Sequence, residues 1–367
     1  MDAALLTKQS FWGDPTPWSK EPVPQFPELE NHVLFKTSGS SGVSKSVAVS
    51  KQALLTSAVA VNHHLKVTHA SRWGLALPVH HVGGFGVCAR AYAADCGFCE
   101  FPERWNALAF QQWSASTGIT HTSLVPTQVH DLVTMGIHAP ANLVAVVVGG
   151  GRLESALGEA ARKLGWPILG SYGMTEASSQ VATDSLDRVS ISYQVGPLPL
   201  LPIWKARMNA DGLLELAGPA LFSGYIIDSR YVPRTTEWHT TADFVELRGQ
   251  FLTMRGRADL VVKIRGKLVD PTEIERQIRA MSGGKIEVDS FAVVAITDAR
   301  SGCVLVPVIQ SGTDLTMVQD VLKTYQITAP ACHRMSDVIE LEDFPRSPLG
   351  KLLRHEIATI CELRRSS

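Results

Sequence analysis

The chain has 367 residues, of which 45% are hydrophobic and 19% charged, and its formal net charge is −1. That length exceeds what one compact core usually organises, so we expect one large domain and one smaller one. The composition excludes bulk disorder, and the balanced charge excludes a long-range positive field that would gather a polyanion. Nucleic acid is therefore not expected as the main partner.

The first residues show no basic stretch leading into an apolar core, and no later run reaches the ~18 apolar residues of a membrane span. We therefore expect a cytoplasmic protein with no membrane span. Six cysteines lie scattered along the chain, which favours reduced thiols over a disulfide framework. Cys96 and Cys99 have the spacing of metal ligands, but no second pair follows at zinc distance, so buried thiols are favoured over a metal or redox role.

Residues 1 to about 30 contain five prolines and no sustained periodicity, which predicts an extended arm packed on the body. From Val33 the pattern alternates between strand and helix, as in an α/β body. The expected strands are VLFKT (33–37), SVAVS (46–50), WGLALPV (73–79), LVAVVVG (143–149) and PILGSY (167–172). The expected helices are 51–65, with Ser50 as its N-cap, and about 104–117, 126–135 and 154–164.

After Tyr193 the sequence changes to short strands separated by turns, with Asp211-Gly212 and Gly249 at the expected hairpin tips. From residue 259 we expect a small α+β domain, whose first helix is capped by Asp270, with Pro271 at its first position and Glu273 as the capping-box acid. Its further strands are expected at 291–298, 303–310 and 338–341, with a helix near 315–325 and a solvated C-terminal end. The predicted fold class is α/β: a large N-terminal body with a β-rich subdomain over 1–258, and a small α+β domain over 259–367.

The strongest local signal is the glycine- and serine-rich segment Thr37–Lys45. Its backbone N–H groups and hydroxyls, with one lysine at the end, can wrap a polyphosphate. The segment nearly matches a P-loop, but a P-loop runs directly into a helix, whereas the β-branched SVAVS follows Lys45. We therefore expect the loop to join two strands. A plain surface turn remains open as an alternative.

Two histidine pairs, His63-His64 and His80-His81, could suggest metal sites. Adjacent histidines on a strand point to opposite faces, and no carboxylate lies at useful spacing, so metal binding is disfavoured there. A single Glu or Asp in a loop is usually solvated, so the acidic residues of the loops gain meaning only in combination.

That combination is present. In chain order the sequence contains TSGSSGVSK (37–45), PVHHVGG (78–84), GGG (149–151), YGMTE (172–176), TAD (241–243), GRAD (256–259) and PRSPLGK (345–351). This series resembles the adenylate-forming superfamily of acyl-CoA synthetases, peptide synthetase adenylation domains and luciferases. The resemblance implies an enzyme that joins a carboxylate to the α-phosphate of ATP and then forms a thioester, with a mobile C-terminal domain.

The resemblance also implies the nucleotide site. The phosphates would be held by Thr37, Ser38, Gly39, Ser40, Ser41, Gly42 and Lys45, and the adenine would lie among Gly149, Gly150, Gly151, Ser171, Tyr172 and Gly173. Thr175 would contact the α-phosphate and Glu176 would bind Mg²⁺. Asp243 and Arg257 would hold the ribose hydroxyls. Lys351 would bridge the carboxylate and the α-phosphate, and Asp259 would be the hinge of the small domain.

For the acyl group, the segment SYGMTEASSQVAT (171–183) closely resembles o-succinylbenzoate:CoA ligases of menaquinone biosynthesis, and SLVPTQ (123–128) and GPLP (196–199) point the same way. The hydroxyl and amide groups of Ser178, Ser179 and Gln180 suit a second carboxylate or a keto oxygen on the substrate. The resemblance makes His81 the gate of the acyl pocket, and its apolar lining would include Val82, Gly83 and Gly84.

For the coenzyme A site, analogy with the family places Gly266 along the approach of the pantetheine arm. Arg265 and Lys267 would contact the CoA phosphates. The sequence departs from the family in three respects. Its phosphate loop begins as early as residue 37, which predicts a reduced N-terminal region, and KIRGKLVDPTEIE (263–275) replaces a Gly-Gly-Glu-Asn type of segment. In addition, Ala242 replaces a Gly and Ser44 replaces a Pro.

The predicted activity is that of an ATP-dependent acid:CoA ligase for o-succinylbenzoate, with ATP, Mg²⁺ and coenzyme A. The alternatives are a ligase for another aryl or acyl acid, one that loads a carrier-protein thiol, a degenerate nucleotide-binding protein without turnover, and last a P-loop phosphohydrolase. A homodimer remains open.

Overall fold

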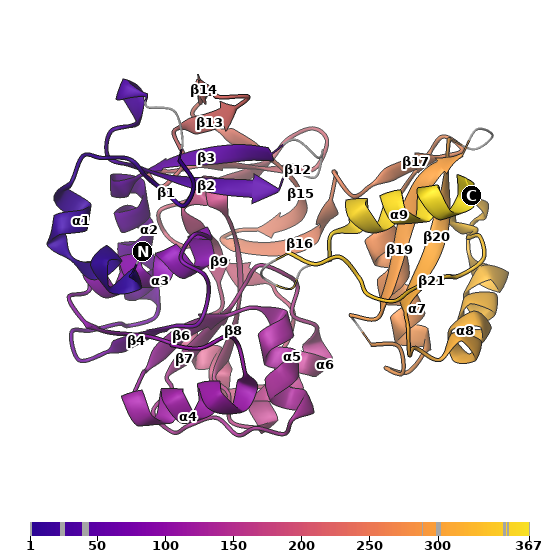
Figure 1. The fold of residues 1–367 in the computed structure, drawn as a ribbon, viewed down its shortest axis with the longest axis horizontal. Helices are drawn as coiled ribbons and strands as arrows, with labels where there is room; N and C mark the ends of the chain where they lie inside the picture. Colours follow the sequence, from indigo (N-terminus) through magenta and orange to yellow (C-terminus); the bar gives the residue numbers. More distant parts are fainter. Residues whose placement is uncertain are drawn as a thin grey trace. The chain divides into compact units, whose positions relative to one another are not determined.

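The computed structural model describes residues 2–22, 26–38, 44–287, 289–298, 302–347, 350 and 352–366. The chain forms two compact units (Figure 1): unit 1 comprises Met1–Thr241 and Val245–Met254, and unit 2 comprises Ala242–Phe244 and Arg255–Ser367. The chain thus enters unit 2 for the last time a few residues before Asp259, the residue that the sequence predicts as a hinge.

A six-stranded sheet in the order β5-β4-β6-β7-β8-β9 forms the centre of unit 1. Its strands are β4 (Arg72–Leu75), β5 (Gly97–Glu100), β6 (His121–Leu124), β7 (Ala145–Val148), β8 (Ile168–Met174) and β9 (Ser179–Thr183). All pair in parallel except β9, which runs antiparallel to β8. Every residue of β6 and β7 is buried, as expected for parallel strands covered on both faces.

Helices connect these strands, as the alternating pattern predicts. They are α2 (Lys51–His64), α3 (Val82–Ala93), α4 (Ala107–Thr117), α5 (Pro126–Thr134) and α6 (Ser155–Lys163). Helix α2 packs on α3, while α4, α5 and α6 lie beside one another, as Figure 1 shows. The predicted cap of α2 is confirmed, because Ser50 Oγ accepts from Ala53 N at 3.1 Å. Helix α3 was not expected from the sequence.

A second sheet carries the glycine- and serine-rich segment. Its order is β1-β2-β3-β13-β14, with β1 (Trp18–Ser19), β2 (His32–Ser38), β3 (Ser44–Ser50), β13 (Gly224–Ile227) and β14 (Arg230–Pro233). Strands β2 and β3 are antiparallel, and Thr37 lies opposite Lys45. The prediction that the segment joins two strands is therefore confirmed, although residues 39–43 themselves lie outside the described residues.

The N-terminal arm is less extended than predicted. It contains a 3-10 turn η1 (Ala3–Thr7) and a short helix α1 (Gln9–Gly13) before β1, and a further 3-10 turn η2 (Pro27–Leu29) precedes β2. The rings of Phe11, Trp12 and Trp18 pack around Phe85 of α3, with centroids 5.9, 6.0 and 5.4 Å away. Burial of these large rings holds the arm on the body, as predicted, while its 3-10 turn and short helix were not expected.

The β-rich part forms a third sheet in the order β10-β16-β15-β12-β11. Its strands are β10 (Leu198–Pro199), β11 (Lys205–Met208), β12 (Leu213–Ala217), β15 (His239–Arg248) and β16 (Phe251–Arg257). The short turn η3 (Thr175–Ala177) lies between β8 and β9 of the central sheet, and η4 (Leu186–Ser190) follows β9. Gly212 and Gly249 lie between paired strands with φ of 80° and 59°, so both predicted hairpin tips are confirmed.

Unit 2 has its own sheet and core. The sheet comprises β19 (Phe291–Asp298), β20 (Gly302–Gln310) and β21 (Ile339–Leu341), and β17 (Val262–Ile264) pairs with β18 (Lys267–Val269). Three helices complete the unit, together with a short turn η5 (Ala331–His333): α7 (Pro271–Met281), α8 (Leu315–Thr328) and α9 (Arg354–Ser366). The predicted cap of α7 is confirmed by the 2.9 Å bond from Thr272 N to Asp270 Oδ1.

The solvated end expected at Arg364 and Arg365 is confirmed, because both residues are exposed, although the helix that carries them was not expected. This helix is α9, in which Ile357 and Cys361 are completely buried and Arg364 donates to the Glu340 carbonyl at 2.6 Å. The six cysteines, all in the described part of the chain, form no disulfide with one another. In the part of the chain that the structure describes, no helix combines the length and the apolar character needed to cross a bilayer.

Candidate nucleotide and acyl site

Thr175 and Glu176 lie in η3, the turn between β8 and β9. The turn is fixed by close backbone approach: a Cβ on Gly173 would lie 1.7 Å from the Ser179 carbonyl oxygen, so only glycine fits there. The Glu176 carbonyl accepts from Phe222 N at 2.8 Å. The backbone that carries the proposed magnesium ligand is therefore held from both sides.

The carboxylate of Glu176 meets two side chains from the second sheet. Lys45 Nζ lies 3.4 Å from Glu176 Oε1, and the Tyr225 hydroxyl donates to the same oxygen at 3.1 Å. Lys45 Nζ also lies 4.0 Å from the centre of the Tyr225 ring. Burial, together with the charge of Glu176, raises the pKa of Tyr225, so its hydroxyl keeps its proton. Lys45 and Glu176, predicted from separate motifs, thus meet in the structure.

His239 of β15 packs beside this cluster, and sequence reasoning missed it. Its ring centroid lies 4.9 Å from that of Phe222. Burial is the main cause that lowers the pKa of His239, opposed by Glu176 and reinforced by Lys45 and Arg234. The ring is therefore neutral at pH 7 and adds no charge beside Lys45.

The residues predicted around adenine follow two neighbouring strands. Gly149 comes directly after β7, and Ser171 and Tyr172 lie in the last part of β8. Ser171 Oγ donates to the Val148 carbonyl at 3.0 Å, and a Cβ on Gly149 would come within 2.9 Å of that hydroxyl. Since ligands in α/β sheets bind at the carboxyl ends of parallel strands, Gly149, Gly150, Gly151 and Tyr172 stand where a nucleotide is expected.

His81 is the N-cap of α3, directly before Val82 and Gly83. Its Nε2 atom is buried and has no hydrogen-bond partner among the residues that the structure describes. Burial, then His80 and Lys20, lowers the pKa of His81 to about 4, so the ring is neutral at pH 7. A Cβ on Gly84 would lie 2.4 Å from the Pro78 carbonyl oxygen, which lets the first turn of α3 approach the preceding loop.

The three polar residues after η3 are all buried, and two of them are occupied within the protein. Ser178 Oγ donates to the Ala220 carbonyl at 2.6 Å, and the Thr183 hydroxyl donates to the side-chain oxygen of Gln180. Ser179 differs, because its hydroxyl accepts from the guanidinium of Arg90 at 3.2 Å. Of the three, Ser179 is therefore the one tied to a charged group.

Arg90 of α3 was missed by sequence reasoning, since the helix itself was not expected and an arginine is usually exposed. Only 2% of it is exposed. Its two terminal nitrogens donate to Ser123 and Ser179, and Nε has no partner in the described part of the chain. Burial lowers the pKa of Arg90 to about 10, which leaves it protonated at pH 7. Its guanidinium also lies 5.2 Å from the centre of the Trp73 ring, and within the described ranges no ion pair with a carboxylate is found for it.

In unit 2, Arg257 joins two of the predicted residues. It donates to Asp243 Oδ1 at 2.9 Å and, through two nitrogens, to both carboxylate oxygens of Asp259 at 2.9 and 2.7 Å. Arg265 and Gly266 form the turn between β17 and β18, with φ of 50° and 81°, and Lys267 follows as an exposed residue.

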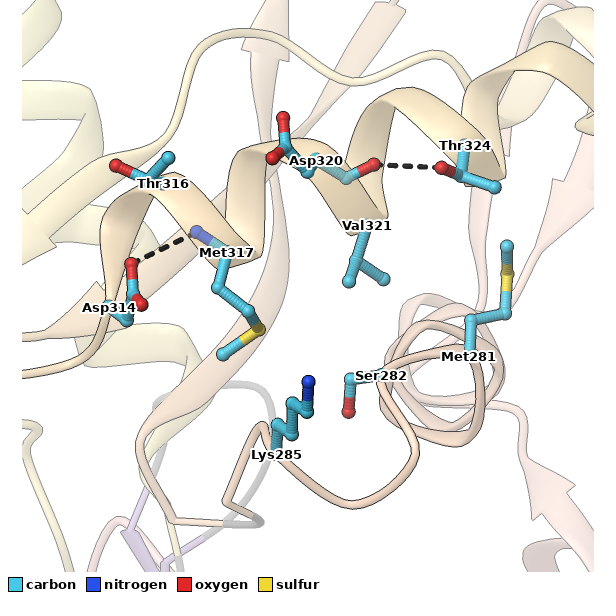
Figure 2. Close-up of a pocket in the computed structure, with 9 residues that line it drawn as sticks. All are labelled: Met281, Ser282, Lys285, Asp314, Thr316, Met317, Asp320, Val321 and Thr324. Carbon is cyan, nitrogen blue, oxygen red and sulfur yellow. Dashed lines mark hydrogen bonds between the residues drawn. The ribbon is translucent and has the colours of Figure 1, made fainter.

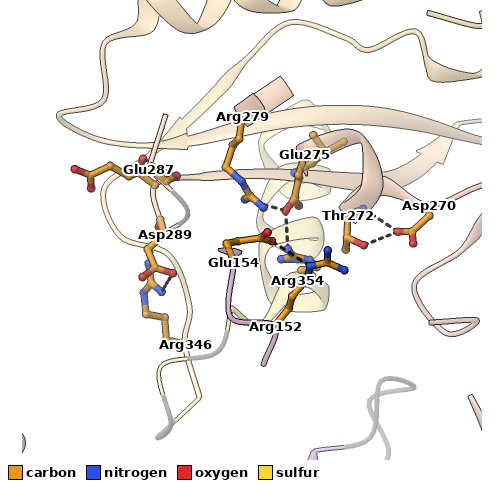
Figure 3. Close-up of polar contacts among 12 residues, drawn as sticks. Arg152, Glu154, Asp270, Thr272, Glu275, Arg279, Glu287, Asp289, Arg346 and Arg354 are labelled. Carbon is orange, nitrogen blue, oxygen red and sulfur yellow. Dashed lines mark hydrogen bonds and ion pairs between the residues drawn. The ribbon is translucent and has the colours of Figure 1, made fainter. Parts of the chain in front are cut away.

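Lys351 lies outside the described residues, but its flanks are held by ion pairs (Figure 3). Before it, Arg346 pairs with Asp289 at 3.2 Å; after it, Arg354 pairs with Glu275 at 2.7 Å. The Glu275 carboxylate also accepts from Val293 N at 2.8 Å. Unit 2 therefore anchors the chain on both sides of the lysine-bearing motif.

A separate hollow of about 460 Å³ lies in unit 2 between the end of α7 and the first turns of α8 (Figure 2). Its polar groups bond within their own helices: Asp314 accepts from Met317 N, Thr324 donates to the Asp320 carbonyl and Ser282 donates to the Arg279 carbonyl. None of the residues predicted for the site lines it.

An α/β body, a β-hairpin whose Lys45 lies beside the acidic turn at Glu176, and a small α+β unit are the features expected of an adenylate-forming enzyme. The model of the AMP-binding enzyme family matches residues 3–226. The chain therefore belongs to the AMP-binding enzyme family, which confirms the resemblance inferred from the motifs.

Among curated relatives, the 2-succinylbenzoate–CoA ligase of Listeria innocua is 27% identical over 336 residues, covering 88% of this chain and 69% of its own length. The ligase of the same name from Staphylococcus aureus is 26% identical, covering 89% and 66%. The chain thus spans about two thirds of the length of these relatives.

Solved structures agree on the fold. An E. coli MenE variant with bound OSB-AMS is 25% identical with a TM-score of 0.71, covering 90% of this chain and 69% of that one. Bacillus subtilis o-succinylbenzoate coenzyme A synthetase, in complex with ATP and a magnesium ion, is 22% identical with a TM-score of 0.73, covering 88% and 69%. These likenesses confirm the predicted α/β fold class with its small C-terminal domain.

Proposed function

We propose that this protein is an ATP-dependent acid:CoA ligase that works through an acyl-adenylate and acts on o-succinylbenzoate. Membership of the AMP-binding enzyme family and the names of the relatives support the class of reaction. The observation that carries the substrate is Arg90, a buried cation without a carboxylate partner in the described residues, because an acid with a second carboxylate would complete it.

In the first half-reaction the substrate carboxylate attacks the α-phosphorus of ATP and pyrophosphate leaves. Negative charges gather, so the site needs cations and N–H donors. Lys45 and the loop Thr37–Gly42 bind the β- and γ-phosphates, and Thr175 donates to the α-phosphate. Lys351 offsets the charge that develops between the carboxylate and the phosphorus.

Glu176 suits a divalent cation. Its Oε1 accepts from Lys45 and Tyr225, and no partner of its Oε2 is found among the described residues. A carboxylate oxygen is the ligand that Mg²⁺ prefers. When bound there, the ion would neutralise phosphate charge.

The nucleoside is held from two sides. The Tyr172 ring stacks on adenine beside the backbone of Gly149–Gly151, and Asp243 accepts from the ribose hydroxyls. Arg257, already bonded to Asp243 and Asp259, orients the ribose-binding carboxylate. Asp259 acts as the hinge of the small domain, for which its place directly after β16 is suited.

The acyl pocket lies along the first turns of α3. Arg90 and Ser179 bind the second carboxylate, while Ser178 and Gln180 hold the pocket wall through their internal bonds. His81, neutral at pH 7, gates the pocket without adding a charge that would compete for the reacting carboxylate. Val82, Gly83 and Gly84 leave room for the aromatic ring.

In the second half-reaction the thiol of coenzyme A attacks the acyl-adenylate carbonyl and AMP leaves. The turn at Gly266 offers an approach without side chains, and Arg265 and Lys267 are exposed cations suited to the CoA phosphates.

Acid-dependent pyrophosphate exchange tests this proposal. We expect exchange with o-succinylbenzoate and much weaker exchange with single-carboxylate analogues of the same size. Arg90→Met should raise the KM for o-succinylbenzoate about 10- to 100-fold, since a charge-assisted hydrogen bond is lost, while the KM for ATP stays constant. Equal KM values for both classes of acid in the wild type would refute the substrate. Nucleotide binding without exchange for any acid would refute the enzyme.

A further inference from the structure

Tyr225 contacts two charged side chains of the proposed mechanism: Lys45, proposed to bind phosphate, and Glu176, proposed to bind the magnesium ion. It lies in β13, which pairs with β3 so that Tyr225 stands opposite Val47, two residues after Lys45. Its hydroxyl donates to Glu176 Oε1 at 3.1 Å, and its ring face lies 4.0 Å from Lys45 Nζ. No sequence motif discussed above includes this tyrosine.

The two contacts keep the lysine and the glutamate apart. An N⁺–H···O⁻ contact pair closes to about 2.7–2.9 Å, as Arg354 and Glu275 do in unit 2 at 2.7 Å. Lys45 and Glu176 are 3.4 Å apart, although their side chains are only 32% and 16% exposed. Each has a second partner in Tyr225: the ring for the ammonium group, through a cation–π contact, and the hydroxyl for the carboxylate.

The consequence concerns what a ligand must displace. If Lys45 and Glu176 formed a closed pair, a nucleotide phosphate and its cation would first have to separate two opposite charges. With Tyr225 present, one oxygen of Glu176 is occupied by weaker contacts, and Oε2 has no partner within the described residues. The lysine rests on a ring face that a phosphate can replace.

We propose that Tyr225 is a positioning residue that holds Glu176 available for a divalent cation and Lys45 available for a nucleotide phosphate. The inference rests on the proposed function, because it takes the nucleotide as ligand of this cluster. Tyr225 would link cation binding to nucleotide binding through two parts of its side chain: the hydroxyl contacts Glu176, and the ring contacts Lys45.

The test measures binding without turnover. Calorimetric titration with α,β-methylene-ATP, in the absence of any acid, gives the affinity with and without Mg²⁺, and the ratio of the two is the Mg²⁺ advantage. Tyr225→Phe removes only the hydroxyl and should lower that advantage about tenfold, as expected for one hydrogen bond to a charged group. The affinity without Mg²⁺ should stay as in the wild type, because the ring remains under Lys45.

Tyr225→Leu removes the ring as well, and should also change the Mg²⁺-free affinity. The matched control is Tyr231→Phe on the adjacent strand β14, whose hydroxyl donates to the Ser223 carbonyl at 3.2 Å and does not contact Glu176. This control should leave the Mg²⁺ advantage unchanged.

An unchanged Mg²⁺ advantage in Tyr225→Phe would overturn the inference, as would an equal loss in the Tyr231→Phe control. A wild-type protein that binds no α,β-methylene-ATP would instead overturn the proposed function. If Tyr225→Leu matches Tyr225→Phe in every respect, the role of the ring is wrong.

Discussion

Two glutamates, Glu176 in unit 1 and Glu275 in unit 2, have basic partners but differ in how completely those partners satisfy them. Glu275 is 1% exposed, lies 2.7 Å from Arg354 and 3.6 Å from Arg279, and accepts a backbone N–H at 2.8 Å. Glu176 is 16% exposed, stands 3.4 Å from Lys45, and has one oxygen without a partner in the described residues.

The comparison suggests different roles: the fully bonded Glu275 stabilises the fold, whereas the incompletely bonded Glu176 is suited to bind a ligand. A buried carboxylate whose oxygens are all bonded holds secondary-structure elements together, and its removal leaves the partner arginines without a counter-charge. A carboxylate with a spare oxygen beside a partly exposed lysine contributes little to folding but can receive a cation. The same residue type can thus be assigned to folding or to binding by counting its bonds.

Replacement of the satisfied glutamate should have the largest effect on stability. Glu275→Gln removes the charge from a carboxylate that is 1% exposed and leaves Arg354 and Arg279 without their charge partner, and we expect the free energy of unfolding to fall by about 3–5 kcal/mol. Urea unfolding followed by circular dichroism measures it. A loss below about 1 kcal/mol would show that the pair is replaceable, and would break the contrast with Glu176.

Replacement of the open glutamate should act on catalysis instead. Glu176→Gln should lower acid-dependent pyrophosphate exchange about 10²- to 10³-fold, the usual cost of removing one preorganised electrostatic group. The free energy of unfolding should change by no more than about 0.5 kcal/mol. A destabilisation as large as that of Glu275→Gln, with exchange retained, would mean that the roles of the two glutamates are reversed.

The smallest effect is expected for an exposed pair on the same helix as Glu275. Glu273 lies beside Arg276, with side chains 42% and 45% exposed. Glu273→Gln should change the free energy of unfolding by less than about 1 kcal/mol, measured by the same urea titration. This variant controls for the loss of a negative charge from α7. A large fall in its free energy of unfolding would show that burial does not explain the effect expected for Glu275→Gln.

Local features of the fold were predictable from the sequence. The hairpin around residues 37–45 follows from the alternation in SVAVS, and the caps at Ser50 and Asp270 follow from short-range hydrogen bonds. Helix α3 was missed because its segment VGGFGVCARAYA contains three glycines, which have low helix propensity. Burial of Phe85 and its neighbours overrides that propensity, and such packing is not visible in a single segment.

The site was predictable only as a set of motifs. Lys45 and Glu176 were expected in one place because the motif order resembles a known family. Arg90 and Tyr225 were not, because their partners Ser179 and Glu176 lie 89 and 49 residues away along the chain. The charge state of Arg90 depends on burial, and burial is set by tertiary packing.

The aromatic packing of the N-terminal arm limits how the chain can be trimmed. Phe11, Trp12 and Trp18 cover Phe85 on the helix that also bears Arg90, and the buried Lys51 donates to the Phe11 and Asp14 carbonyls at 2.7 and 2.6 Å. Without residues 1–18, the Phe85 ring would lose aromatic side chains that cover it, and the Lys51 ammonium group would lose its two carbonyl acceptors. Residues 1–18 therefore support the helix that carries Arg90, and a purification tag is better placed at the C-terminal end.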